Sequence, residues 1–476
     1  MPNRLIGRER EKALLESFAL SDKPEFVAIY GRRRVGKTFL VNQVFSGRMT
    51  FSMTGILEGD RRAQMHAFVD AMDQCGHPLA KAPADWYEAF QLLRHHLAVR
   101  MKDNDAPAIV FIDELPCLDT RGSDFTSALG YFWNSWASLQ PRMLLIVCGS
   151  ATSWMMKNVI DSHGGLHDRI THEIHLREFT LSEAEKFLQA FALPWDRLTM
   201  AQAYMAFGGI PYYLSLLEPA ESLAQNIDRL CFRADGEMRR EFHRLYKTLF
   251  ATPDPYIAIV EALFKRKQGM SREEIATSIS KDANGRLTQM LQNLVDCDIL
   301  RFYYTKQKKI SARGGIYQLT DFYSIFYLQF VKNGSTDEHF WTKSIGTPTQ
   351  HTWLGLSFER LCLAHIPQIK QALHIDTIKT EHYAWRSSDP QQKAQIDLVI
   401  ERADRMVNIV EAKYSELPYL LDKSGYERLQ RRIALYQLQT APKAGIIPTV
   451  ITANGLQRNA YSEHIICQLL LDDLFR

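Results

Sequence analysis

The segment GRRRVGKT, residues 31–38, combines small, cationic and hydroxyl side chains at a spacing that suits a phosphate chain. Its glycines let the backbone curl so that N–H groups and the N-terminus of the next helix face the phosphates. Lys37 would reach the β- and γ-phosphates of a nucleotide, and the hydroxyl of Thr38 would bind Mg²⁺. We therefore expect ATP and Mg²⁺ to bind here. The residues expected to contact ATP are Gly31, Arg32, Arg33, Arg34, Val35, Gly36, Lys37, Thr38 and Phe39.

A pair of carboxylates, Asp113 and Glu114, follows an apolar run at 109–112. Such a run is typical of a buried parallel strand, and ligands of open α/β sheets bind at the carboxyl ends of the strands. Alone, an acidic pair after a strand is more often a solvated turn. Because a phosphate loop precedes it in the same predicted sheet, we expect Asp113 to hold the Mg²⁺ shell and Glu114 to polarise the attacking water.

Ser150, Arg169 and the loop arginines each have two interpretations. Ser150 follows another apolar run, 143–148, where its hydroxyl would sense the γ-phosphate, cap the following helix, or do both. Arg169 lies in a glycine-led loop before a further strand. Its guanidinium either stabilises the charge that develops in phosphoryl transfer or forms a surface salt bridge. The arginines at 32–34 either contact the nucleotide or form a basic edge that faces a partner. Ser150 is also among the residues expected to bind ATP.

These side chains need a parallel sheet to bring them to one edge. A β-prone apolar run at 26–30 precedes the phosphate loop, and an apolar-periodic helix follows it, which is the context that a phosphate-binding loop requires. Residues 61–101 have a mostly helical pattern. From residue 181 to about 250 the strand signals stop and helix-opening signals take over, which predicts a small helical lid over the nucleotide.

Taken together, these motifs resemble those of the AAA-type P-loop ATPases of the archaeal clade, which are related to the STAND signalling ATPases. The matching pieces, all in the first half of the chain, are IGRERE, GRRRVGKT, FIDELP, the CGS strand end, HDRITHEIHLREFT and FGGIPYYL. The resemblance implies that the N-terminal Gly-Arg-Glu segment lies against adenine. It also implies that Arg169 contacts the γ-phosphate or acts in trans, in a protein that works as a homo-oligomer or a switch.

Between residues 253 and 332 the pattern changes to three helices and two strands. YIAIVEALFKRK is amphipathic, SREEIATSI opens with a capping box, and NGRLTQMLQNLVDCDIL carries apolar residues on one face. RFYYTKQKKISARGGIYQLTD then alternates as two strands around a turn. This order predicts a winged helix, which either binds DNA through its third helix and wing or serves only for protein packing. A local excess of basic residues, including Lys306, Lys308 and Lys309 in the wing, favours DNA as a partner.

A further set of chemistry-bearing residues lies near the C-terminus. Two strands around a short turn are predicted over AQIDLVIERADRMVNIVEAK. Asp397 begins the first strand, while Glu411 and Lys413 end the second and project to the same face. Upstream, Glu359 stands among apolar neighbours on a predicted helix.

An Asp followed by Glu-x-Lys across a hairpin resembles the PD-(D/E)xK nucleases, and this region also resembles the domain of unknown function often fused to such ATPases. The resemblance implies that Asp397 and Glu411 hold Mg²⁺ against the scissile phosphate, and that Lys413 is the catalytic base or offsets charge. Glu359 matches the acidic residue that these folds often supply from their first helix, and joins the expected metal ligands. The proline that usually precedes the aspartate is replaced by Gln-Ile, and a scaffold with a decayed site is the alternative.

The composition is that of an ordinary globular protein. The chain has 476 residues, 46% of them hydrophobic and 23% charged, and its net charge of +3 is too small to imply a nucleic-acid or membrane partner by itself. Seven scattered cysteines without a C-x-x-C pair argue against a disulfide framework or a zinc site. The first residues lack a signal-peptide pattern, and no stretch approaches the ~18 apolar residues of a membrane span. We therefore expect a cytoplasmic protein with no membrane partner.

The predicted fold is α/β: a P-loop AAA-type ATPase domain with a helical lid, a winged-helix domain and a C-terminal restriction-endonuclease-like α/β domain. The expected boundaries are 1–180 for the ATPase core, 181–252 for the lid, 253–332 for the winged helix and 345–476 for the nuclease-like domain. We expect ATP hydrolysis coupled to a DNA-directed module that is a Mg²⁺-dependent nuclease. The competing hypotheses are a STAND-like nucleotide switch and a DNA-binding regulator, each with a C-terminal domain that is not catalytic.

Overall fold

The computed structural model describes residues 4–103, 106–161, 166, 168–304, 315–387, 389 and 391–476. The chain forms two compact units. The first unit comprises Met1–Glu178, Leu245–Pro253 and Asp296–Asp298, and the second comprises Phe179–Arg244, Asp254–Val295 and Ile299–Arg476. Most of the segment predicted as a lid thus groups with the second unit. The four domain boundaries drawn from the sequence stay a prediction.

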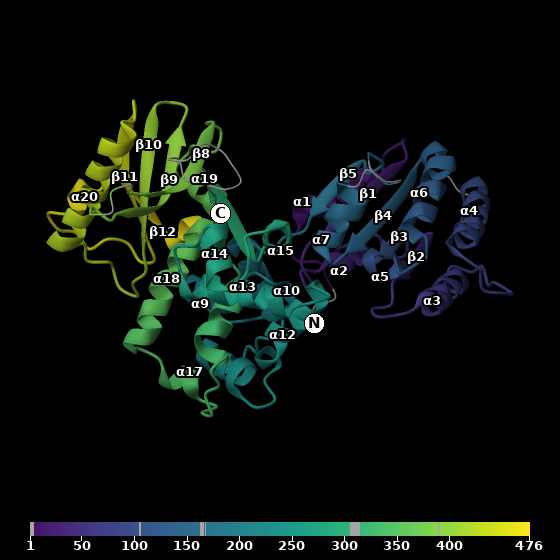
Figure 1. Cartoon of the computed structure of the whole chain (residues 1–476), viewed down its shortest axis with the longest axis horizontal. Coiled ribbons are helices and arrows are strands. Elements are labelled where there is room, and N and C mark those ends of the chain that lie inside the picture. Colours follow the sequence, from purple (N-terminus) through teal and green to yellow (C-terminus); the bar gives the residue numbers. More distant parts are fainter. Residues whose placement is uncertain are drawn as a thin grey trace. The chain divides into compact units, whose positions relative to one another are not determined.

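The first unit is built on a five-stranded parallel sheet in the order β2-β3-β4-β1-β5 (Figure 1). Its strands are β1 (Glu25–Tyr30), β2 (Phe51–Thr54), β3 (Ala108–Asp113), β4 (Met143–Gly149) and β5 (His172–His175). The predicted α/β fold with a parallel sheet is confirmed. The edge strand β2 was not predicted, because four residues are too few for a clear alternation pattern.

Helices cover both faces of this sheet. They are α1 (Glu9–Ala19), α2 (Lys37–Val44), α3 (Arg61–Gln74), α4 (Trp86–Asp103), α5 (Leu115–Leu118), α6 (Phe125–Ser135), η1 (Ala137–Leu139), α7 (Thr152–Met155) and η2 (Met156–Ile160). Side chains alternate along each strand, so Phe26, Val110 and Leu145 share one face and join the core formed with α3, α4 and α6. Buried residues of α1 and α2, such as Leu15 and Leu40, lie outside that core cluster.

The second unit is mostly helical. Its helices are α8 (Leu181–Ala190), α9 (Arg197–Phe207), α10 (Pro211–Leu214), α11 (Leu223–Ile227), η3 (Asp228–Phe232), η4 (Glu237–Arg239), α13 (Asp254–Lys265), α14 (Arg272–Ser278), α15 (Gly285–Asp296), α16 (Phe322–Phe326), η5 (Tyr327–Val331), α17 (Phe340–Lys343), α18 (Pro348–Ala364), α19 (Ile366–Ala372), α20 (Lys423–Thr440), η6 (Ser462–His464) and η7 (Leu471–Phe475). The helix α12 (Glu241–Leu249) contains one boundary between the units.

Three of these helices, α13, α14 and α15, precede a two-stranded antiparallel sheet of β6 (Leu300–Tyr304) and β7 (Gly315–Leu319). The order of three helices and a hairpin is the one that the sequence predicts. The capping box at the start of α14 is also present, since Ser271 and Glu274 each bond the other's backbone N–H. The tip of the hairpin, with Lys306, Lys308 and Lys309, lies outside the described residues.

A second five-stranded sheet, in the order β12-β11-β10-β9-β8, forms the C-terminal part of the second unit. Its strands are β8 (Thr380–Arg386), β9 (Gln395–Arg402), β10 (Met406–Lys413), β11 (Gly445–Thr452) and β12 (Cys467–Leu470). The strands β8, β9 and β10 pair antiparallel, and β10, β11 and β12 pair parallel. Leu429, Ile433 and Tyr436 of α20 pack on this sheet against Trp385 and Val399.

The segment 333–350 has the composition of a linker, yet α17 and the start of α18 lie within it. The carboxylate of Asp228 anchors α17 by accepting hydrogen bonds from the backbone N–H groups of Trp341 (2.7 Å) and Thr342 (3.1 Å). The indole of Trp341 then packs in an aromatic cluster with Trp353, at 5.2 Å between ring centroids. A contact more than 100 residues away in sequence therefore orders a segment whose own composition is loop-like.

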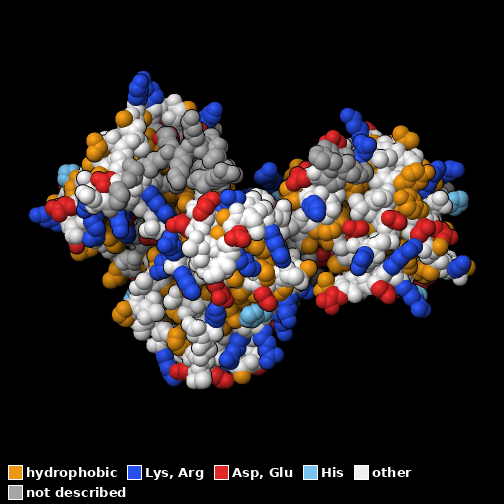
Figure 2. All heavy atoms as spheres, in the orientation of Figure 1, with side chains coloured by type: hydrophobic (Ala, Val, Ile, Leu, Met, Phe, Trp, Pro, Cys, Tyr) orange, Lys and Arg blue, Asp and Glu red, His pale blue; other side chains and the backbone are white. Residues whose placement is uncertain are grey.

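The face of the protein drawn in Figure 2 does not single out one charged region. On the face drawn in Figure 2, Lys and Arg side chains are interspersed with Asp and Glu. Across the described part of the chain, no helix is both long and apolar enough to traverse a lipid bilayer.

Candidate functional sites

The phosphate loop of the first unit connects β1 to α2 and is held by a close backbone approach. Gly31 has a φ of 147°, and a Cβ atom there would lie 2.2 Å from the carbonyl oxygen of Leu176. The N–H of Leu176 donates to the carbonyl of Tyr30 at 2.8 Å, so β5 continues alongside the loop. Only glycine fits this position.

Lys37, the first residue of α2, is buried. The hydrogen bonds of its ammonium group go to the phosphate loop. Its Nζ donates to the carbonyl oxygens of Gly31 (2.8 Å) and Arg32 (3.1 Å). Burial lowers the pKa of Lys37, and the nearby carboxylates of Glu114 and Asp113 act in the opposite direction. Among the described residues, no carboxylate forms an ion pair with Lys37. The ammonium is thus placed to take up the negative charge of a phosphate.

Thr38 and Asp113 form the arrangement that a nucleotide-bound Mg²⁺ needs. The Thr38 hydroxyl donates to Oδ2 of Asp113 at 2.6 Å, and Oδ1 of Asp113 accepts from the N–H of Glu114 at 2.9 Å. Burial raises the pKa of Asp113, which the Thr38 hydrogen bond partly offsets. A hydroxyl and a carboxylate oxygen are hard donors, so these residues fit Mg²⁺. Thr38 lies at the start of α2, which follows β1, and Asp113 ends β3; β4 lies between β1 and β3 in the sheet.

Glu114 stands beside this pair and is held by the end of β4. Its backbone is left-handed, with φ 48°. Its Oε2 accepts hydrogen bonds from both the hydroxyl (2.8 Å) and the N–H (3.2 Å) of Ser150. The alternative role of Ser150 as a helix cap is wrong. The helix α7 has Ala151 at its N-cap position with no side-chain cap, because the Ser150 hydroxyl is directed to Glu114 instead.

The remaining predicted nucleotide contacts differ in their surroundings. Arg32 and Val35 are buried, Phe39 is 41% exposed, and Arg33 donates from Nη1 to the hydroxyl of Thr248 at 2.7 Å. Arg34 has a left-handed backbone with φ 72°, and Gly36 has φ 92°. The turn before β5 places Arg169 at an exposed position. No hydrogen bond or ion pair within the described ranges joins the Arg169 side chain to the phosphate loop.

One residue of the first site was not predicted. Arg8 is 5% exposed and its guanidinium donates to the carbonyls of Val35 (3.3 Å), inside the phosphate loop, and of Arg177 (2.6 Å), after β5. Its backbone is left-handed, with φ 64°. The sequence draws attention to the IGRERE segment, but only the fold shows that Arg8 supports the loop.

The second unit brings together the four C-terminal residues predicted to act on phosphodiesters. The hairpin register pairs Val410 with Leu398, so the next positions, Glu411 and Asp397, lie opposite each other and share a face. The helix α18, which carries Glu359, packs on β10. Burial, and to a smaller extent the charges of Asp397 and Glu411, raise the pKa of Glu359 to about 7.

Glu411 is the most heavily paired member of this carboxylate centre, which we define as Glu359, Asp397, Glu411 and Lys413. Its carboxylate contacts Nζ of Lys413 at 2.7 Å and a guanidinium nitrogen of Arg432. Burial works to raise the pKa of Glu411, but the two cations outweigh it and hold the pKa below its usual value. The pairing of Arg432, on α20, with Glu411 was not predicted from the sequence.

The carboxylate oxygens of Glu359, Asp397 and Glu411 are hard donors of the kind that Mg²⁺ prefers. Burial is the main cause of the raised pKa of Glu359, and a cation would relieve the repulsion from Asp397 and Glu411 that adds to it. Within the ranges that the structure describes, however, no group of three or more His, Cys, Asp and Glu side chains is arranged to hold a metal ion. In this arrangement Lys413 and Arg432 supply the positive charge at Glu411, and the amide of Gln395 donates to Oδ1 of Asp397 at 2.6 Å.

Comparison with known proteins assigns the first site to a class. Residues 5–217 match the model of a family described as an ATPase domain predominantly from Archaea. This part of the chain is therefore similar to archaeal-type ATPase domains, which supports the coarse interpretation of the sequence. P-loop proteins of this kind use nucleotide and Mg²⁺ in general.

Similarity over the whole chain is more distant. An uncharacterized protein of Methanocaldococcus jannaschii, MJECL04, is 23% identical over 443 residues, which cover 92% of this chain and 94% of that protein. The Walker-type ATPase paby2304 of Pyrococcus abyssi aligns with 68% of this chain and 96% of its own chain at 17% identity, with a TM-score of 0.50. The likeness to the Pyrococcus protein supports the fold alone.

Proposed function

We propose that the first unit binds ATP with Mg²⁺ and hydrolyses it. The observation that carries this proposal is the contact between Thr38 and Asp113, with Glu114 adjacent, at the end of the sheet that also carries the phosphate loop. The match of residues 5–217 to an ATPase domain supports it. Thr38 and Asp113 would hold the Mg²⁺, which neutralises charge on the phosphates when bound.

In this proposal each residue of the chain has a separate role. Lys37 and the N-terminus of α2 bind the phosphates. Glu114 orients the attacking water and accepts its proton, and Ser150 fixes the Glu114 carboxylate by two hydrogen bonds. Arg169 remains a candidate for stabilising the transferred phosphoryl group, within its own chain or in trans.

Exchange of Glu114 for glutamine tests this assignment. Because an amide cannot accept the proton, Glu114→Gln should lower the rate of phosphate release roughly 10²-fold or more, while ATP binding is retained. The exposed Glu58→Gln is the matched control and should leave the rate unchanged. Wild-type hydrolysis by the Glu114→Gln protein would remove Glu114 from the mechanism.

We further propose that the second unit is a nucleic-acid-directed module, composed of a winged helix over 253–332 and a PD-(D/E)xK-like domain that cleaves phosphodiesters. Two observations support it: three helices and a hairpin in the order of a winged helix, and the electrostatic coupling of Glu359 to Asp397, Glu411 and Lys413. Asp397 and Glu411, with Glu359, would hold Mg²⁺, which would polarise the scissile phosphate and lower the pKa of a bound water. Lys413 would position that water or offset the charge that develops.

Plasmid incubation with Mg²⁺ tests the cleavage step. Wild-type protein should nick or linearise the plasmid, and Lys413→Ala should reduce the rate by roughly 10²-fold. The control Lys423→Ala removes an exposed lysine of α20 and should have no effect. Equal activity of the wild type and Lys413→Ala, or no cleavage by either, contradicts the nuclease.

A second candidate function is a STAND-like switch whose C-terminal domain only binds a partner. The observation that favours it is the neutralisation of Glu411 by Lys413 and Arg432, which leaves the carboxylate centre without a ready metal site. This function predicts slow ATP turnover, tightly retained nucleotide, and no effect of Lys413→Ala in the plasmid experiment.

A further inference from the structure

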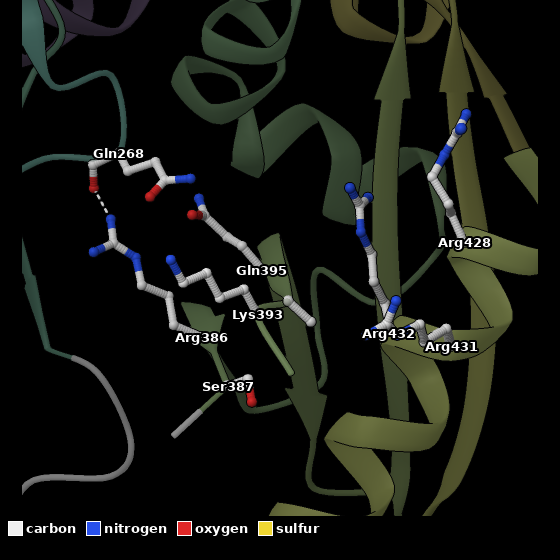
Figure 3. Close-up of a pocket in the computed structure, with 9 residues that line it drawn as sticks. Gln268, Arg386, Ser387, Lys393, Gln395, Arg428, Arg431 and Arg432 are labelled. Carbon is white, nitrogen blue, oxygen red and sulfur yellow. Dashed lines mark hydrogen bonds between the residues drawn. The ribbon is translucent and has the colours of Figure 1, made fainter. Parts of the chain in front are cut away.

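A basic pocket of about 440 Å³ lies beside the carboxylate centre in the second unit (Figure 3). Arg386 at the end of β8 and Lys393 before β9 lie on one side, together with Gln395. Three arginines of α20 line the other side: Arg428, Arg431 and Arg432. We use the name basic pocket for the space lined by these five cations and Gln395.

The cations of the basic pocket are nearly without carboxylate partners. Among the described residues, only Arg432 forms an ion pair, with Glu411. Arg386 donates to the backbone carbonyl of Gln268, and Arg428 donates from Nη1 to the hydroxyl of Ser424 at 2.9 Å. Five positive charges around one concave space repel one another, so the arrangement favours an anionic ligand that spans several of them.

The types of side chain indicate which anion. Four of the five cations are arginines, whose planar guanidinium groups match the oxygens of phosphate in a bidentate way. None of the described residues that line the pocket is aromatic, so these residues offer no ring on which a base could stack. The pocket therefore recognises a phosphate backbone rather than a base sequence. Its volume is in the range of small-ligand sites, ~300–1,000 Å³, so it accommodates a short stretch of one phosphate backbone.

Arg432 connects this pocket to the carboxylate centre. It lines the basic pocket and also a smaller adjoining pocket that contains Glu411 and Lys413. A strand whose phosphates occupy the basic pocket therefore runs directly to the proposed cleavage site. Gln395, which lines the basic pocket, donates its amide to Asp397 of the same centre.

We propose that the basic pocket binds the phosphate backbone of a single nucleic-acid strand and leads that strand to the carboxylate centre. The assignment rests on the proposed nucleic-acid function of the second unit, and it names the substrate class. It requires neither bound metal nor ATP, because the contacts are made by the side chains of the pocket.

Fluorescence anisotropy of a labelled single-stranded oligonucleotide of about 15 nucleotides tests the proposal, with the full-length chain in EDTA and without ATP. Over about 50 to 200 mM salt, four phosphate contacts give a slope of log K against log [salt] of about −3. The double variant Arg428→Ala/Arg431→Ala should weaken binding at least ten-fold and reduce the slope by about 1.4. Lys423→Ala, on the same helix but paired with Glu427, should change neither quantity.

Three outcomes overturn the proposal. The first is oligonucleotide binding that is unchanged in Arg428→Ala/Arg431→Ala. The second is loss of binding only when Lys306, Lys308 and Lys309 of the predicted wing are neutralised. The third is equally tight binding of a duplex of the same sequence that the pocket variant weakens to the same extent. Circular dichroism and ATP hydrolysis of the pocket variant verify that it folds.

The binding experiment tests the pocket independently of the nuclease hypothesis. Strand binding in EDTA that depends on Arg428 and Arg431, together with no plasmid cleavage in Mg²⁺, supports the pocket and contradicts the nuclease. Inorganic tripolyphosphate serves as a second probe. It should compete for the wild-type pocket, and failure to compete at tenfold excess over the oligonucleotide would contradict recognition through phosphate.

Discussion

The two centres of this protein treat their charges in opposite ways. In the first unit, the ammonium of Lys37 is bonded to the backbone carbonyls of Gly31 and Arg32, and Asp113 is bonded to the neutral hydroxyl of Thr38. In the second unit, the carboxylate of Glu411 is in direct contact with the cations of Lys413 and Arg432. The first centre keeps its positive and negative groups apart, and the second neutralises them against each other.

This difference indicates what each centre needs from its ligand. A separated ammonium and carboxylate can bind a phosphate chain and its Mg²⁺ without breaking an existing ion pair. A neutralised carboxylate must give up a cation before a metal ion can replace it. The first centre is therefore preorganised for the proposed ligand, whereas the second would have to exchange partners before it could bind a metal ion.

The largest expected effect is on the first centre. Lys37→Ala removes the ammonium that we propose binds the phosphates, and should lower kcat/KM for ATP hydrolysis by ~10²–10³-fold. Oligonucleotide binding by the second unit should stay within two-fold of wild type if the centres are independent in EDTA. The matched control is Lys12→Ala, an exposed lysine of α1 that pairs with Glu16. Loss of both ATP hydrolysis and oligonucleotide binding in Lys37→Ala would show that the two centres are not independent.

The second prediction concerns a buried histidine that belongs to the second unit alone. Burial lowers the pKa of His365 to about 4. Its Nε2 accepts from the N–H of Leu181 at 3.0 Å, and its Nδ1 bonds the carbonyl of Leu361 at 2.9 Å, so the ring is neutral. Because the folded-state pKa lies below the ordinary 6.5, the stabilisation is present above pH 6.5 and is lost as the pH falls from 6.5 to about 4.

The difference between these pKa values corresponds to about 3 kcal/mol of unfolding free energy. Native-state hydrogen exchange of amides in the second unit, measured from pH 7 to pH 4, should show this loss in the wild type. His365→Gln, which keeps a neutral acceptor, should remove most of the pH dependence. An identical pH profile in the variant would assign the acid sensitivity to other groups.

The third prediction tests the exchange of partners at Glu411. Arg432→Gln removes one of its two cations, so a divalent cation meets less competition there. We expect Mn²⁺ affinity at the second centre to rise roughly ten-fold, equivalent to about 1.4 kcal/mol. Titration calorimetry in an Asp113→Asn background separates this centre from the first. Unchanged or weaker Mn²⁺ binding would show that Arg432 does not compete with the metal.

The smallest expected effect comes from a matched pair of helix caps, one in each unit. Asp60 accepts from the N–H of Ala63 at the start of α3, and Thr180 accepts from the N–H of Glu183 at the start of α8. Replacement of either residue by alanine should cost about 1 kcal/mol. Hydrogen exchange should show faster opening only in the unit that carries the change. Acceleration in both units would show that they unfold together.

The local pattern of the sequence was sufficient for the phosphate loop of the first unit and for the strand before Asp113. The strand, loop and helix around GRRRVGKT are contiguous, and their glycines, lysine and threonine carry the signal without any distant partner. The buried run before Asp113 marks a parallel strand in the same way. Some strands were not predicted. The strand β2 has only four residues, and β8, β11 and β12 neither alternate clearly between polar and apolar residues nor adjoin a recognisable motif.

What the sequence by itself determined is the set of residue types that can bind a triphosphate and the hairpin that places Asp397 opposite Glu411. Only the tertiary structure decided their partners: Arg8 beneath the phosphate loop, Ser150 on Glu114, and Arg432 on Glu411. The physical reason is that local order follows from periodicity and turn residues, which neighbouring positions specify. Hydrogen bonds and ion pairs between elements depend on packing that brings together residues 21 to 169 positions apart.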